Sequence, residues 1–92
     1  MESELRLDLI IVGRVQGVGY RDFTKKKADS LSITGSVKNM RDGTVLVTAQ
    51  GGNEAMGNFL KWCYKGPKGA IVRKIDKVKG QTEDFNGFIV IY

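Results

Sequence analysis

The 92-residue sequence contains no histidine and only one cysteine, Cys63. Without histidine, the protein lacks the commonest acid–base group at neutral pH, the usual zinc ligand and any Ser–His or Cys–His nucleophile system. A single cysteine cannot form an internal disulfide, so stability is expected to come from packing. We expect neither a metal nor a cofactor, because the acidic residues form no spacing typical of a metal site: Asp22, Asp29, Asp42, Glu83 and Asp84.

Long apolar runs, repeats and low-complexity stretches are also lacking. No segment approaches the ~20 apolar residues that a membrane span needs. The start, Met1 to Arg6, has no basic region followed by an apolar run and a cleavage site, which argues against secretion. The sequence therefore predicts one cytoplasmic domain over residues 1–92, with no membrane contact and in monomeric form.

Basic residues outnumber acidic ones by 15 to 10, which gives a formal net charge of +5. This surplus favours anionic partners such as phosphorylated metabolites, nucleic acid or acidic surfaces. Charge alone does not choose among them, and it is equally typical of a soluble protein with a basic surface.

Hydrophobic periodicity predicts five strands and two helices. The first strand is apolar on both faces from Leu9 to Val12, as expected of a strand inside a covered sheet. Asn53 is expected to cap the second helix, in which Phe59, Leu60 and Cys63 share an apolar face. Cys63 is therefore predicted to lie in the core. The predicted strands cover residues 5–15, 33–39, 44–50, 70–78 and 88–92; the helices cover residues 22–31 and 53–65, the second ended by Gly66-Pro67.

This order predicts an α+β fold: a ferredoxin-like βαββαβ sandwich with one additional final strand, in which two helices cover one face of an antiparallel sheet. Such a fold serves enzymes, RNA-binding proteins and metal carriers alike, so it does not decide the function.

Residues 13–21, GRVQGVGYR, connect the first strand to the first helix through a glycine-rich loop. Such a loop can turn successive backbone N–H groups inward to bind an anion, and the helix N-terminus adds partial positive charge. Arg21 can supply a planar, permanently charged group for phosphate oxygens. The alternative is a tight turn followed by a solvated arginine. The predicted phosphate-binding residues are Gln16, Gly17, Val18, Gly19, Tyr20 and Arg21.

Residues 13–21 resemble the first signature of the acylphosphatase family, G-x-V-x-G-V-x-[FY]-R, at every fixed position. Residues 35–51 resemble the second signature, G-[aromatic]-V-x-N-x-x-x-G-x-V-x-x-x-x-x-G. Ser36 is the one departure, because the family usually has an aromatic residue there. We expect Ser36 to affect packing rather than chemistry, since its side chain should point to the face of the strand opposite Asn39.

The resemblance implies that Arg21 binds the phosphate and that Asn39 orients the attacking water. The substrate would be a small-molecule acyl phosphate, and inorganic phosphate or a similar anion would occupy the loop. Because a carboxylate leaves without a proton, no general acid is needed, which agrees with the missing histidine. Without the resemblance, an asparagine before a β-turn would be assigned to capping that turn. Arg21 and Asn39 are expected to lie on adjacent strand ends.

Two other functions are alternatives to this one. A nucleic-acid-binding module would use the basic strand that carries Arg73, Lys74, Lys77 and Lys79. However, RNA-binding modules of this fold place aromatic residues on the third strand, and residues 44–50 contain none. No nucleic-acid partner is therefore expected. The other alternative is a catalytically weak relative that only binds phosphate or carbamoyl groups.

Overall fold

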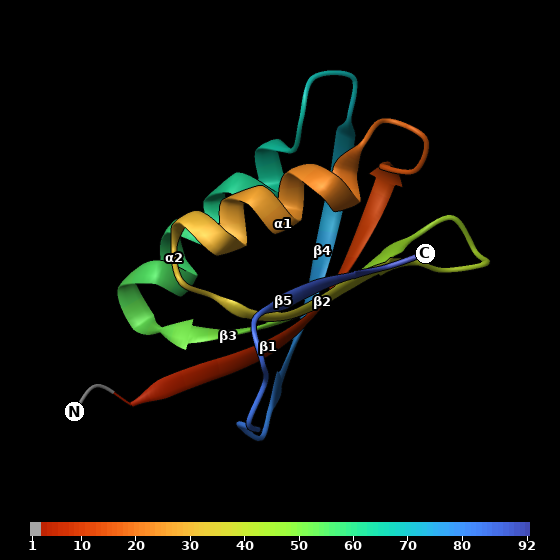
Figure 1. Ribbon diagram of the computed structural model, residues 1–92. Helices are drawn as coiled ribbons and strands as arrows, with labels where there is room; N and C mark the ends of the chain where they lie inside the picture. The colour runs from red at the N-terminus through yellow and green to blue at the C-terminus, as the bar shows by residue number, and fades with distance from the viewer. Residues whose placement is uncertain (1–2) are drawn as a thin grey trace.

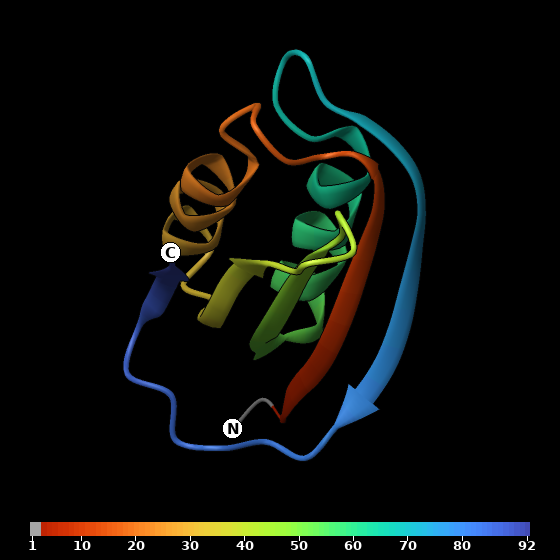
Figure 2. The same cartoon turned by 90° about the vertical axis from the view of Figure 1, so that its right-hand side faces the viewer.

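The computed structural model describes residues 3–92 and contains one five-stranded sheet with two helices on one face (Figures 1 and 2). The ferredoxin-like α+β prediction is confirmed. The strands are β1 (Glu4–Arg14), β2 (Thr34–Asn39), β3 (Val45–Gly52), β4 (Ile71–Gly80) and β5 (Phe88–Ile91); the helices are α1 (Tyr20–Ser30) and α2 (Asn53–Lys65).

The strand order in the sheet is β4-β1-β3-β2-β5. The first four strands pair antiparallel, but β5 pairs parallel with β2, in a register that places Ser36 beside Ile89 and Val37 beside Val90. The prediction of an entirely antiparallel sheet was wrong for this last strand. The chain leaves β4 at one edge and crosses to the other edge before β5 begins, so β5 enters the sheet in the direction of β2 (Figure 2).

The core lies between the helices and the covered face of the sheet. Leu9, Val37 and Val47 are fully buried there, and Phe59 of α2 contacts Phe88 of β5 edge to face, with ring centroids 6.2 Å apart. Cys63 is buried in this core, as predicted, and burial raises the pKa of its thiol to about 12. The thiol therefore stays protonated and contributes packing rather than chemistry.

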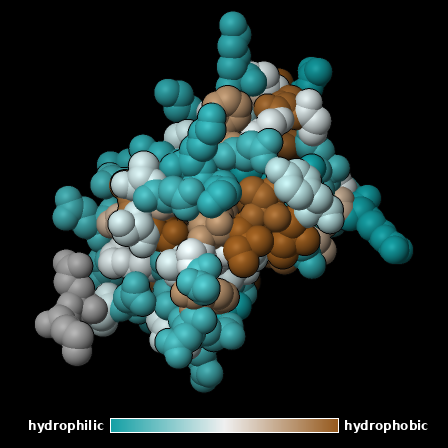
Figure 3. Space-filling view, viewed as in Figure 1, coloured by the Kyte–Doolittle hydropathy of each residue, from teal (hydrophilic) through white to brown (hydrophobic). Residues whose placement is uncertain are grey.

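The other face of the sheet is not covered by a helix. Ile10 of β1 is 38% exposed and Val78 of β4 is 57% exposed, so the expectation of two covered faces around Leu9 to Val12 was wrong. A strand with apolar side chains on its solvent-facing side has the same continuous apolar sequence as a strand whose two faces are both covered by helices. Viewed from the β5 edge, Figure 3 shows a hydrophobic patch over β5, where Ile89 and Ile91 are exposed.

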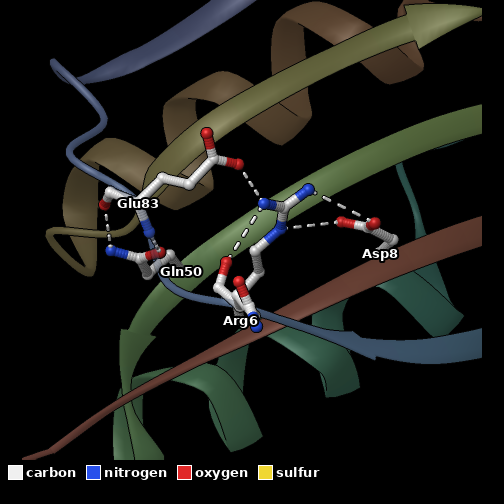
Figure 4. Close-up of polar contacts among 5 residues, drawn as sticks. Arg6, Asp8, Gln50 and Glu83 are labelled. Carbon is white, nitrogen blue, oxygen red and sulfur yellow. Dashed lines mark hydrogen bonds and ion pairs between the residues drawn. The ribbon is translucent and has the colours of Figure 1, made fainter.

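The chain between β4 and β5 is fastened across the open face by polar contacts (Figure 4). Arg6 pairs with Asp8 (Nε to Oδ1, 3.2 Å) and with Glu83, and it donates to the backbone oxygen of Gln81. Gln50, which is 4% exposed, donates to the backbone oxygen of Glu83 (2.8 Å) and accepts from its N–H (2.9 Å). These contacts fix the path that delivers β5 beside β2.

The helix ends differ from the sequence-based expectation at two points. α1 begins at Tyr20 rather than Asp22, so Arg21 lies in its first turn. Gly52, not Asn53, is the N-cap of α2, and no side chain caps this helix. Asn53 is instead the first helical residue. The predicted end of α2 at Gly66 is confirmed. Within residues 3–92, neither helix has the length and apolar character to span a membrane.

Candidate active site

A small pocket of about 90 Å³ lies where β1 and β2 end and α1 begins. Because β1 and β2 are both antiparallel to β3, they run in the same direction, and their C-terminal ends lie on the same side of the domain. The pocket brings Arg21 and Asn39 together, although not on adjacent strand ends as predicted: Arg21 lies on α1, and β3 separates β1 from β2. The pocket is lined by Val15, Gly17, Gly19, Tyr20, Arg21, Asp22, Asn39 and Tyr92.

The loop of residues 15–19 forms one wall of the pocket. Gly17 and Gly19 have φ values of 77° and 78°, in the left-handed region that side chains with a Cβ avoid. Gly19 is also the N-cap of α1, and no side chain caps that helix end. The first N–H groups of a helix have no intrahelical partner, so those of α1 are available to an anion at this wall. The local backbone is therefore of the kind that can form an anion-binding cradle.

Arg21 is held at the wall by two contacts with the end of β5. Its Nη1 donates to the backbone oxygen of Ile91 (3.1 Å), and its guanidinium carbon lies 4.8 Å from the centroid of the Tyr92 ring. The Tyr92 hydroxyl in turn donates to Oδ1 of Asp22 (2.7 Å), a hydrogen bond that raises the pKa of Tyr92. These contacts restrict the arginine before any ligand arrives, which lowers the cost of ordering it on binding.

Tyr20 fastens the start of α1 to α2. Its hydroxyl donates to the backbone oxygen of Cys63 (2.7 Å), and its ring packs 5.6 Å from that of Trp62. Only 2% of Tyr20 is exposed, and this burial raises the pKa of its hydroxyl far above the usual range. The Tyr20 hydroxyl is therefore not a proton donor or acceptor for chemistry at neutral pH.

Asn39 is the last residue of β2 and is half-buried against the pocket. The turn that follows is closed by other groups: Met40 N–H donates to the Thr44 oxygen (2.8 Å), and Asp42 accepts from the N–H and hydroxyl of Thr44 (3.0 and 2.6 Å). The Thr44 hydrogen bonds lower the pKa of Asp42. Within residues 3–92, no hydrogen bond joins the Asn39 amide to this turn, so the amide can serve the pocket.

Gln16 connects the loop to the same turn. Its Nε2 donates to the backbone oxygens of Met40 (2.8 Å) and Thr44 (2.9 Å). Of the predicted phosphate-binding residues, Gly17, Gly19, Tyr20 and Arg21 line the pocket, whereas Gln16 and Val18 do not. The Gln16 side chain thus sets the distance between the anion cradle and Asn39.

If the protein hydrolyses acyl phosphates, as the sequence resemblance implies, we expect a Gln16→Ala substitution to lower kcat/KM by about tenfold, because two hydrogen bonds of about 1 kcal/mol each no longer hold the loop against the turn. Steady-state kinetics on the purified variant measures this. The exposed Gln81 at the far end of the molecule provides a matched control, and Gln81→Ala should behave as the wild type. Unchanged kinetics in Gln16→Ala would mean that the loop keeps its place without this clamp.

Three pocket residues were not predicted from the sequence: Val15, Asp22 and Tyr92. Tyr92 lies 70 residues or more from the loop, and only the parallel pairing of β5 with β2 brings it there. No local pattern indicates such a contact. Within residues 3–92, no group of three or more His, Cys, Asp or Glu side chains lies together so that it could hold a metal ion.

Comparison with known proteins places these features in a family. The sequence model described as Acylphosphatase matches residues 7–90. The chain is 42% identical to the acylphosphatase of Thermus thermophilus over 92% of this chain and 97% of that protein, and 39% identical to that of Salinibacter ruber over 96% and 94%. Its fold is similar to the crystal structure of acylphosphatase from Bacillus subtilis, with a TM-score of 0.92 and 34% identity over 96% of this chain and 99% of the other.

Proposed function

Since this chain belongs to the acylphosphatase family and is a hydrolase of acyl phosphates, we propose that the pocket of about 90 Å³ is its active site. The observation that carries the proposal is that one pocket joins the two glycines of the loop, Arg21 and Asn39. It supplies a cradle for the phosphoryl group, a fixed cation and an uncharged amide.

In the proposed reaction the oxygen of a water molecule attacks phosphorus, and the bond between phosphorus and the acyl oxygen breaks. The carboxylate leaves with the bonding electrons, and a proton of the water passes to a phosphoryl oxygen. The products are a carboxylate and inorganic phosphate. Because a carboxylate is a weak base, its departure needs no general acid. The enzyme then has to bind the phosphoryl charge and place the water in line.

We assign phosphate binding to Arg21 and to the backbone N–H groups of residues 16–20. The guanidinium is permanently charged and planar, so it can donate two parallel hydrogen bonds to phosphoryl oxygens. In this proposal the N–H groups of the loop and of the start of α1 face the same phosphoryl group, which is supported by the left-handed Gly17 and Gly19 and by the uncapped start of α1 at Gly19. Negative charge is redistributed over the equatorial oxygens of the phosphoryl group in the transition state. Both the guanidinium and the backbone N–H groups are expected to bind these oxygens more strongly there than in the ground state.

We assign water placement to Asn39. A carboxamide has both an acceptor oxygen and donor N–H groups, so it can orient a water molecule without changing its own charge. Its lack of charge also matters, because a carboxylate at this position would repel the phosphate. Residues 1–92 would form one such catalytic domain, acting in the cytoplasm as a monomer and without a metal.

We expect the purified protein to hydrolyse acetyl phosphate and benzoyl phosphate in excess EDTA at the rate seen without chelator, because the proposed groups are a backbone cradle, Arg21 and Asn39. Release of inorganic phosphate measures this. A folded protein that binds phosphate but hydrolyses neither compound would favour the catalytically weak relative. Activity that EDTA abolishes and a divalent cation restores would contradict the metal-free mechanism.

A further inference from the structure

Charge is divided unequally between the two ends of the molecule. The domain is elongated, with principal extents of 38 × 22 × 21 Å. The loop of residues 15–19, the turn of residues 40–44 and the segment of residues 66–70 lie at the active-site end, and the segment of residues 81–87 lies at the other end (Figure 1). Around the active-site end, basic residues outnumber the acidic ones: Arg14, Arg21, Lys38, Arg41, Lys65, Lys68 and Arg73 against Asp22 and Asp42.

The opposite end is mainly acidic. It includes the start of β1, the start of α2 and the segment that leads to β5. Basic residues are fewer there than at the active-site end, and one of them, Arg6, is paired with Asp8 and Glu83. The acidic residues there are Glu4, Asp8, Glu54, Glu83 and Asp84. The positive charge of the protein is thus concentrated where the substrate enters.

Four of the basic side chains, which we call the basic rim, line two hollows at the active-site end rather than the active-site pocket itself: Arg14, Lys38, Arg41 and Arg73. A hollow of about 460 Å³ shares Asn39 with the pocket and includes Lys38 and Arg41. A second hollow of about 380 Å³ shares Asp42 with the first and includes Arg14 and Arg73. The first hollow therefore adjoins the pocket at Asn39, and the second adjoins the first at Asp42.

The basic rim keeps a net positive charge. None of the four side chains takes part in an ion pair among residues 3–92. Asp42, the acidic residue of the two hollows, offsets one of the four positive charges, and its carboxylate accepts hydrogen bonds from the N–H and the hydroxyl of Thr44. Such a group of like charges around a concave site raises the local concentration of oppositely charged ligands.

From this arrangement we propose that the basic rim selects acyl phosphates by their total negative charge, favouring those whose acyl part carries a further carboxylate or phosphate. The inference rests on the proposed function and names the substrate class of that same site. The rim would act through its field on the approaching and bound substrate, in addition to the direct contacts of Arg21. Since exposed charges are screened within about 10 Å at 0.1 M ionic strength, the preference should depend on salt.

The test compares benzoyl phosphate with its para-carboxylate analogue, which differ by one charge, between 0.01 and 0.5 M ionic strength. At 0.01 M, Arg73→Gln should lower kcat/KM about threefold for benzoyl phosphate and about fivefold for the analogue, from the interaction of one charge at about 10 Å in water. The double variant Arg41→Gln/Arg73→Gln should lose about sevenfold for benzoyl phosphate. At 0.5 M the variants and the wild type should agree.

Lys79→Gln is the matched control. Lys79 lies on the same strand as Arg73, about 20 Å farther from the active-site end at 3.3 Å per residue, and it is likewise exposed. The same loss in both variants would mean that only net charge matters and would overturn the inference. A loss in Arg73→Gln that persists at 0.5 M would do the same, because it would indicate a direct contact or a structural defect.

The wild type separates this inference from the proposed function. A kcat/KM that is the same at all salt concentrations, with substantial turnover, would overturn the inference alone. Absence of hydrolysis at every salt concentration would overturn the proposed function and the inference with it. A steeper salt dependence for the para-carboxylate analogue than for benzoyl phosphate in the wild type, reduced in the double variant, is the result expected.

Discussion

An Arg21→Gln variant is expected to lose acyl phosphate hydrolysis by about a thousandfold, the range found when a single charged or oxyanion-stabilising group is removed from a transition state. Arg21 is the permanently charged side chain that lines the pocket on the side of α1, and its guanidinium is already positioned by the oxygen of Ile91 and the ring of Tyr92. Glutamine keeps some hydrogen-bonding capacity but no charge, so the phosphoryl group loses its main counter-charge.

The same variant should also lose affinity for inorganic phosphate, which competitive inhibition or calorimetry measures. Arg21→Lys provides the finer comparison, because it keeps the charge but cannot donate the paired hydrogen bonds, and it should fall between wild type and Arg21→Gln. Lys79→Gln controls for the loss of one positive charge, and thermal melting checks the fold. If Arg21→Gln kept normal phosphate affinity and turnover, the arginine would have no part in the site.

Much of the fold could be predicted because local pattern and tertiary structure agree. The four-residue spacing of Thr24 and Ala28 places both in the core, and the Asp42-Gly43 pair lies in the turn between β2 and β3, as the sequence indicates. Every predicted strand and helix is present within a few residues of its expected bounds. Propensity, turn residues and apolar faces point to the same structure in these segments.

The features that were not predicted depend on contacts distant in the sequence. The direction of β5 is decided by the path of residues 81–87 over the open face, which Arg6 and Gln50 fix from β1 and β3. Ser36 lies on the same open face, beside Thr48 of β3 and Ile89 of β5. Ser36 and Asn39 therefore lie on opposite faces of β2, as their spacing indicates, and the effect of Ser36 on packing rather than chemistry stays a prediction.

The candidate site was predicted where a short segment carries its own geometry. The left-handed Gly17 and Gly19 and the following Arg21 are adjacent in sequence, so one motif specifies the cradle and its cation. The support around that motif is not local. Gln16 reaches a turn more than twenty residues away, and Tyr92 reaches Arg21 and Asp22 from the last strand. Sequence reasoning therefore finds the groups that we propose to act, but it does not show that Gln16 reaches the turn or that Tyr92 reaches the pocket.

For Asn39→Ala we expect a loss in kcat of about a hundredfold to a thousandfold, with little change in affinity for inorganic phosphate. The amide lines the pocket but has no hydrogen bond to the turn within residues 3–92, so its removal leaves the turn closed by Asp42 and Thr44. Water can still enter, but it is no longer oriented. The expected pattern differs from that of Arg21→Gln, which loses kcat and phosphate binding together.

Asn39→Asp sharpens this separation, because it keeps the shape of the side chain and adds a negative charge beside the phosphate. It should weaken phosphate binding as well as turnover, whereas Asn39→Ala should weaken turnover alone. Asn58→Ala, at an exposed position on α2, is the matched control for removing a carboxamide. If Asn39→Ala lost phosphate affinity in proportion to kcat, Asn39 would belong with Arg21 in phosphate binding, and another group would have to place the water.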